Sequence, residues 1–169
     1  VPARGLIGYT TEFMSLTKGF GIINHTFDHY APVVPGKVGG RHQGVLVSME
    51  NGKATTYGMM GVEDRGTLFV EPGTEVYEGM IVGENTRDND ITVNITKQKQ
   101  KTNIRSANKD QTNVIKKPRI LTLEEALEYL SDDEYLEVTP ESIRLRKQIL
   151  DKGERERVAK KKKFAELEN

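Results

Sequence analysis

Basic residues gather in one segment whose composition suits phosphate binding. Residues 88–118 form the longest stretch without a periodic apolar pattern, and the part from Thr96 to Lys117 carries seven bases against one acid, Asp110. Lysine ammonium groups act as flexible point charges and arginine supplies a planar fork, so both suit phosphate oxygens. No aromatic residue lies in this segment, which favours contacts to a nucleic-acid backbone over base stacking. The predicted RNA-binding residues, including one base outside the segment, are Lys97, Lys99, Lys101, Arg105, Lys109, Lys116, Lys117 and Arg41.

The same segment has a simpler interpretation, a solvated surface loop that binds nothing. Its length argues for a function, because long connections without secondary structure are uncommon in compact domains. The sequence alone leaves both interpretations open.

His25, Asp28 and His29 are the candidate residues for a metal or catalytic site. On a strand His25 and His29 share a face with Phe27, while Asp28 points to the other face. This spacing is more typical of packed or hydrogen-bonded histidines than of metal ligands. A small metal-dependent hydrolase using His25 and His29 is the alternative function, which stoichiometric metal surviving dialysis would support.

Glu63 and Asp64, beside Arg65, form a second candidate pair for acid–base chemistry. No nucleophile or further constellation accompanies them, so turn residues that close hydrogen bonds are the better explanation. A glycine-rich phosphate loop with its lysine is also absent from the sequence, and so is cysteine. We therefore predict no catalytic residue, no metal ligand and no cofactor in these 169 residues.

Charge is segregated along a chain that is neutral overall, with 25 Lys and Arg against 25 Asp and Glu. Residues 120–141 hold eight acids and no base, whereas residues 142–163 hold ten bases and three acids. Local fields must therefore carry any electrostatic function. No apolar run approaches membrane-spanning length, and we expect no membrane partner. The opening Val1-Pro2, without a methionine, suggests a fragment of a longer protein.

The first thirty residues have the pattern strand, helix, strand. Residues 1–3 look like the end of a strand, and apolar residues at three- and four-residue steps from Leu6 to Thr17 predict a helix that stops at Gly19. Branched and aromatic residues at 20–30 predict a second strand. Together these elements are half of a split βαβ sandwich.

From Gly44 onward the pattern is mainly β. Alternation over residues 45–50 predicts a strand, Asn51-Gly52 predicts a hairpin turn, and residues 53–60 are the expected return strand. Further strands are expected at residues 67–70 and around Met80 and Val82, separated by turns at residues 61–66 and at Pro72-Gly73. Short strands at this spacing are typical of a small barrel or sandwich.

Beyond the basic segment, Thr122 is the expected N-cap of a helix that runs through Leu130, with Glu125 completing a capping box. We expect one face of this helix to be lined by Leu123, Leu127 and Leu130. Two short strands around the turn at Thr139-Pro140 should follow, and then a basic helix over residues 150–167.

These segments resemble the BipA/TypA family of ribosome-associated translational GTPases. Residues 1–34 look like the second half of domain five of elongation-factor-G-type GTPases, with Leu16-Thr17-Lys18-Gly19 and Phe27-Asp28-His29-Tyr30 in that family's order. The continuation is similar to the BipA/TypA C-terminal domain in PG (35–36), NGKA (51–54), GVEDRG (61–66), VYEGMIVG (76–83), NDITVN (89–94), KTNIR (101–105), LEEALEYL (123–130) and EVTPESIRLR (137–146).

The resemblance implies an α+β fold: half of a ferredoxin-like split βαβ domain at 1–34, then a mainly β small-barrel domain at 35–169. Within the second domain it places a basic loop at 88–118, an acidic helix at 122–131 and a basic helix at 150–167.

The function that the resemblance implies is non-catalytic ribosome and RNA binding in the A-site region. Its expected partners are large-subunit rRNA and the stalk base, the tRNA acceptor stem, and the remaining domains of the same protein. By resemblance, the bases that reach toward the tRNA are Lys97, Lys99, Lys101, Arg105 and Lys109. The full-length parent would be a cytoplasmic, ribosome-associated GTPase with GTP and magnesium in its missing N-terminal domain.

Overall fold

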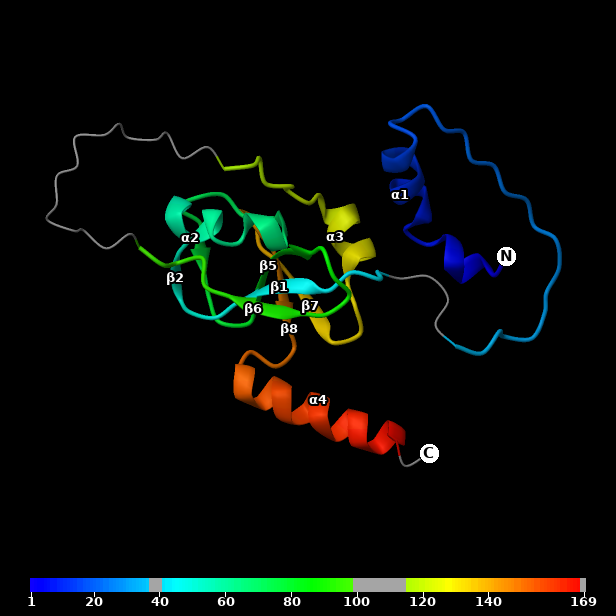
Figure 1. Ribbon diagram of the computed structural model, residues 1–169. Coiled ribbons are helices and arrows are strands. Elements are labelled where there is room, and N and C mark those ends of the chain that lie inside the picture. Colours follow the sequence, from blue (N-terminus) through cyan, green and yellow to red (C-terminus); the bar gives the residue numbers. More distant parts are fainter. Residues whose placement is uncertain (37–40, 99–114, 168–169) are drawn as a thin grey trace, which may run out of the picture.

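A mixed six-stranded sheet forms the centre of the computed structural model, which describes residues 1–36, 41–98 and 115–167 (Figure 1). The strand order is β6-β1-β5-β8-β7, and β3 also pairs with β5. Only β1 and β6 run parallel among these described pairs. The strands are β1 (Val45–Ser48), β3 (Gly66–Leu68), β5 (Met80–Asn85), β6 (Ile91–Val93), β7 (Glu134–Val138) and β8 (Ile143–Lys147).

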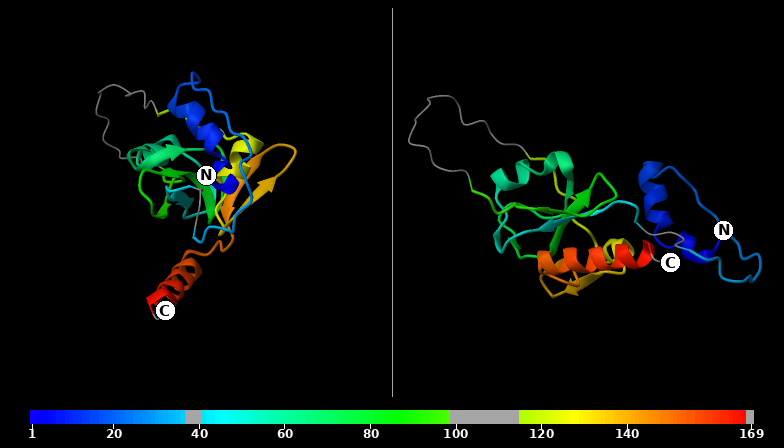
Figure 2. Two further views of the ribbon diagram at one scale, coloured as in Figure 1. Left: turned by 90° about the vertical axis from the view of Figure 1, so that its right-hand side faces the viewer. Right: turned by 60° about the horizontal axis from the view of Figure 1, so that its bottom comes forward.

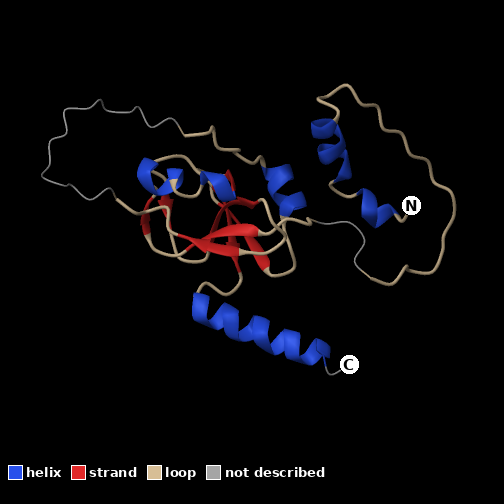
Figure 3. Cartoon of the chain, in the orientation of Figure 1, coloured by secondary structure: helices blue, strands red, loops and turns tan. Residues whose placement is uncertain are grey.

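Figure 3 shows the described helices in blue and the strands in red, and the helix nearest the N-terminus stands apart from the sheet. The helices are α1 (Tyr9–Leu16), α2 (Thr56–Met60), α3 (Leu123–Tyr129) and α4 (Lys152–Leu167), with 3-10 turns η1 (Ala3–Leu6) and η2 (Glu63–Arg65). This mixture of one main sheet and a few helices confirms the predicted α+β class.

The four residues of β1 are all buried because both faces of the strand are covered. Leu46 points into a core that includes Met59 of α2 and Ile95, while Val45 and Val47 point into a second core with Ala126 and Tyr129 of α3. The sheet is thus the middle layer of the fold.

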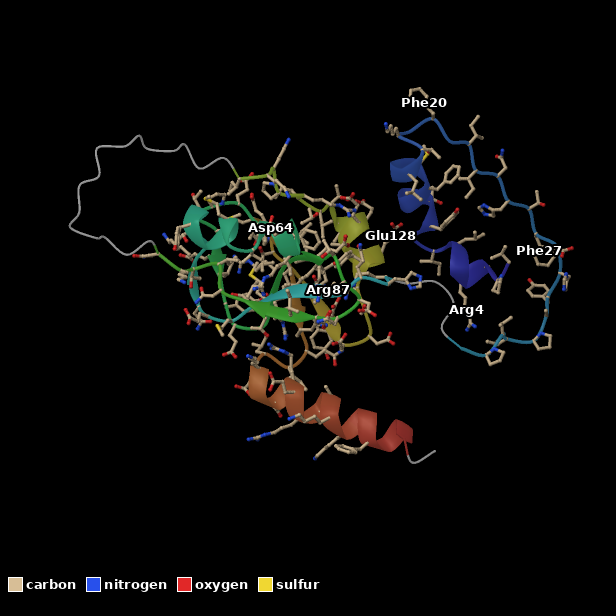
Figure 4. The ribbon with its side chains drawn as sticks, viewed as in Figure 1. Arg4, Phe20, Phe27, Asp64, Arg87 and Glu128 are labelled. Carbon is tan, nitrogen blue, oxygen red and sulfur yellow. The ribbon has the colours of Figure 1, made fainter. Side chains whose placement is uncertain are left out.

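The strands expected in the first thirty residues are not formed. Residues 3–6 make the turn η1, and residues 20–30 have no regular secondary structure, although α1 appears where a helix is predicted. A strand is stable only when its backbone groups pair with a neighbour, and no described strand lies beside this segment. Its aromatic side chains are consequently exposed, Phe20 by 89% and Tyr30 by 94%. In Figure 4, Phe20 and Phe27 lie far from the sheet.

The hairpin expected at Asn51-Gly52 is also absent. Gly52 lies in β2 (Gly52–Lys53), which pairs with β4 (Glu75–Val76) and not with β1. The expected return strand is replaced by α2, because the Thr55 side chain caps this helix and accepts a hydrogen bond from the Gly58 amide at 3.0 Å. The chain bends at Glu50 and Asn51, but the partner of β2 is β4, more than twenty residues later in the sequence.

Helix α3 begins with the predicted capping box, in which Thr122 and Glu125 exchange side-chain to backbone hydrogen bonds. Its buried face is only partly the expected one. Leu130 packs against the second core as expected. Ala126 and Tyr129 are buried, whereas Leu123 and Leu127 are 40% and 57% exposed. Helix α3 therefore packs through Ala126 and Tyr129, which are three residues apart and share a helix face. The small side chain of Ala126 allows the helix to approach the sheet closely. The predicted strand pair β7–β8 and the predicted helix α4 are confirmed.

Candidate nucleic-acid interface

The predicted RNA-binding residues divide into those that the structure describes and those that it does not. Lys97, Lys116, Lys117 and Arg41 are described, whereas Lys99, Lys101, Arg105 and Lys109 lie outside the described residues. The described part of the candidate site therefore consists of the two ends of the basic segment and Arg41.

The first end of the basic segment is fixed by β6 and α2. After β6, the buried Ile95 inserts into the core below α2, and its carbonyl oxygen accepts the Thr55 amide at 2.8 Å. The Thr55 hydroxyl then donates to the Lys97 carbonyl oxygen at 2.5 Å. Thr55 thus caps α2 and also determines where the backbone of Lys97 lies.

The second end returns to the same part of the fold. Ile115 packs against the core that contains Ile95, and the Lys116 amide donates to the Glu63 carboxylate of η2 at 2.5 Å. Three residues after Lys116, the Arg119 amide donates to the Leu68 carbonyl oxygen at 2.8 Å. Glu63, one of the predicted turn residues, therefore fixes the second end of the segment through this hydrogen bond.

Three lysines at these ends have free charges. Lys97, Lys116 and Lys117 are exposed, and none forms an ion pair with another described residue. An exposed ammonium group without a carboxylate partner keeps its full charge for a phosphate. The stretch from Thr55 to Glu63 thus holds both ends of the basic segment, and the lysines at these ends are exposed to solvent.

Arg41 has a different environment. Its guanidinium forms a bidentate ion pair with Glu134, with N···O distances of 3.0 and 2.7 Å, and lies 4.4 Å from the ring centroid of Tyr129. Its side chain is only 10% exposed. Burial alone would lower the pKa of Arg41, but the hydrogen bond and charge of Glu134 raise it overall. RNA binding by Arg41 stays a prediction, and its guanidinium donates to Gln43, Tyr129 and Glu134 within the fold.

Lys147 extends this buried ionic cluster. Its ammonium lies 2.6 Å from Asp90, 2.8 Å from Asp133 and 2.9 Å from Glu134, which joins the turn before β6 to β7 and β8. Burial lowers the pKa of Lys147, but the hydrogen bonds to Asp133 and Asp90 outweigh this effect and raise it. Sequence reasoning did not identify the cluster. The alternation of side chains along a strand could have indicated it: Lys147 is two residues after the apolar Leu145, so both side chains lie on the same, buried face of β8.

The histidine candidates do not assemble into a site. His25 and His29 lie in the exposed segment after α1, where His29 Nδ1 is 2.8 Å from the Asp28 carboxylate. Within residues 1–36, 41–98 and 115–167, no three His, Cys, Asp or Glu residues are grouped so that they could hold a metal ion. No described helix is long and apolar enough to cross a membrane.

Comparison with known families agrees with this architecture. Residues 1–39 match the family described as "Elongation factor G C-terminus", so this first part of the chain is similar to the C-terminal part of a translation factor. Residues 43–152 match the family described as "TypA/BipA C-terminal domain". The chain belongs to this TypA/BipA family, and the resemblance found in the sequence is confirmed.

Curated relatives carry the name "Large ribosomal subunit assembly factor BipA". The protein of that name from Bacillus subtilis (strain 168) is 74% identical over 167 residues, which cover 99% of this chain and 27% of the relative. The one from Escherichia coli (strain K12) is 49% identical over 157 residues, covering 93% of this chain and 26% of the relative. The one from Haemophilus influenzae is 45% identical over 157 residues. The chain thus spans about a quarter of the length of these relatives.

Proposed function

We propose that this chain is the ribosome- and RNA-binding module of a BipA-type translational GTPase, and that its basic segment contacts tRNA and rRNA phosphates. One observation carries the proposal: both ends of a segment with seven bases are anchored on the single stretch from Thr55 to Glu63. Anchoring of this kind presents a concentrated positive charge from a fixed place on the fold. The names of the relatives supply the partner, the large ribosomal subunit.

Catalysis belongs to another part of the parent protein in this proposal. The chain has no glycine-rich phosphate loop, so GTP and its magnesium would be held by a domain outside residues 1–169. The role of these residues is then to orient the parent protein in the A-site region of a cytoplasmic ribosome. Contacts to the tRNA acceptor stem would come from Lys97 and the bases that follow it.

The affinity for RNA should depend strongly on salt. About five phosphate contacts predict a slope of about −3.5 to −4.5 when the logarithm of the association constant is plotted against that of salt concentration. Replacing Lys97, Lys99 and Lys101 together by alanine should flatten this slope by about 2 to 3. Each phosphate contact that is lost reduces the number of counterions released when RNA binds.

The test measures binding of the 169-residue chain to purified large ribosomal subunits by sedimentation over a range of salt concentrations. A control variant loses the same number of exposed bases elsewhere: Lys18, Lys53 and Arg87. The proposal requires a flatter slope for the triple-lysine variant and a smaller change for the control. If both variants bind with the unaltered slope, the basic segment is not the contact.

A further inference from the structure

Helix α4 is fixed to the sheet at its beginning. Asp151 caps it by accepting the Glu154 amide at 2.7 Å, and the Lys152 amide donates to the Glu78 carboxylate at 3.1 Å. Arg155 folds back and donates to the carbonyl oxygens of Ile149, at 3.0 Å, and Leu150. These contacts determine the direction in which the remaining turns of α4 extend.

One side of α4 faces the sheet. Lys152, Arg155, Val158 and Ala159 line an open groove of about 730 Å³, whose opposite wall includes Lys147 of β8. The partly buried members of this helix belong to this inner side, since Lys152, Arg155 and Val158 are half-buried. The apolar residues Val158 and Ala159 of α4 therefore face the sheet.

The other side of α4 carries a basic stripe, which consists of Arg157, Lys160, Lys161 and Phe164. Steps of three and four residues put these side chains on one helix face. All of them are exposed, Phe164 by 67%. None of the three bases forms an ion pair with a described residue. Glu156 of the helix is directed to Lys152 at 3.9 Å, and Glu154 lies in the first turn, three residues before Arg157.

We propose that this stripe is a second RNA contact, which binds the phosphate backbone of an RNA duplex. Adjacent positions of the stripe are about 5–6 Å apart at Cβ, so long basic side chains on a rigid helix can reach successive phosphates. Charge complementarity selects this partner: the stripe presents three free cations and a single aromatic ring. A helix that inserts into a lipid surface needs a broad apolar face, and the half-buried Val158 faces the sheet instead.

The stripe and the basic segment lie on different parts of the fold. Figures 1 and 2 place α4 below the sheet, away from α2, to which the ends of the basic segment are anchored. Two separated contacts can engage two RNA sites at once, and the second binding event is then intramolecular. This inference rests on the proposed function only in taking RNA as the partner.

The test replaces Arg157, Lys160 and Lys161 together by glutamine in the 169-residue chain and measures affinity for an RNA duplex of about 16 base pairs against salt. The expected result is a slope flatter by about 2 to 3. The control variant Lys18→Gln, Lys53→Gln, Arg87→Gln loses as many charges and should change the slope less. Exchanging Arg and Lys within the stripe should leave the slope unchanged, and circular dichroism should show unaltered helix content.

An unchanged slope in the stripe variant, or an equal loss in the control, would overturn the proposal. A second measurement uses vesicles that contain phosphatidylserine. If the chain binds these vesicles more tightly than the RNA duplex, and Phe164→Ser abolishes that binding, the partner of the stripe is a lipid surface and not RNA. The alanine variant of Lys97, Lys99 and Lys101 separates the two sites. If it alone loses affinity, the stripe is excluded; if the stripe variant alone loses affinity, the proposed function of the basic segment fails and the stripe stands.

Discussion

Gly58 of α2 lies directly against the backbone of Ile95. A Cβ atom built on Gly58 would stand 2.4 Å from the Ile95 carbonyl oxygen, far inside normal contact distance. That carbonyl oxygen also accepts the Thr55 amide, so the start of α2 is in close contact with the residue directly before Thr96, where the basic part of the segment begins. The size of a single side chain therefore decides whether the base of this segment can form.

Substitution Gly58→Ala should destabilise the protein by about 1 to 3 kcal/mol, because the backbone on both sides has to shift. Gly61→Ala is the matched control, since its Cβ would meet only the Gly58 carbonyl oxygen at 3.5 Å and its φ of −68° suits alanine. The control should be neutral or stabilising by up to about 1 kcal/mol. Urea denaturation measures both changes, and equal effects would contradict the close contact.

Glu134→Gln should be among the more damaging single changes in the chain. The Glu134 side chain is fully buried and accepts hydrogen bonds from Arg41, Lys147 and the Ser131 amide. Removing its charge leaves buried cations with less compensation, at a cost of about 3 kcal/mol or more. Glu156→Gln removes the same charge from an exposed pair with Lys152 and should stay within about 0.5 kcal/mol. A difference in unfolding free energy below about 1 kcal/mol between the two variants would argue against the cluster.

Stability should fall in acid partly through Asp133. Burial raises the pKa of this carboxyl, but its hydrogen bond and attraction to Lys147 prevail and hold the pKa below the ordinary 3.8. A lowered pKa in the folded state contributes stability above the unfolded value, and this contribution disappears as the pH falls through the folded value. The loss due to Asp133 therefore begins near pH 3.8 and continues below it.

The variant Asp133→Asn isolates this effect. Its unfolding free energy should be lower than that of the original chain at neutral pH, and the difference should shrink as the pH falls below 3.8. Denaturation in urea at a series of pH values gives the comparison. Parallel curves for the two proteins would show that Lys147 does not stabilise the ionised carboxylate.

Removal of residues 1–34 should leave the rest of the chain folded. Neither described core cluster contains a residue from this segment. Residues 1–34 come close to the rest of the chain at Gly8. A Cβ atom built on Gly8 would lie 3.7 Å from the Cβ of Glu128, which is labelled on α3 in Figure 4. We expect a cooperative thermal transition for the truncated chain, and faster amide exchange for α1 than for β1 and β5 in the intact chain. A truncated chain without a cooperative transition would show that the segment completes the core.

Features that depend on neighbouring residues were predictable from the sequence. The capping box of Thr122 and Glu125 and the strand pair around Thr139-Pro140 are encoded within a few residues, and the structure contains both. Strand β6 shows the opposite case: its residues lie inside the segment 88–118, which has no strand pattern of its own. Its three residues become a strand because β1, more than forty positions earlier, pairs with them in parallel.

The sequence by itself determined the family of this chain and the positions of its charges, because composition and short motifs do not depend on folding. Only the tertiary structure decided which charges are free. Arg41 and Lys97 are both bases in polar stretches, yet Arg41 is buried against Glu134 while Lys97 is exposed beside the cap of α2. An ion pair needs two side chains within a few ångströms, and Arg41 and Glu134, 93 positions apart, reach that distance only through the folded sheet.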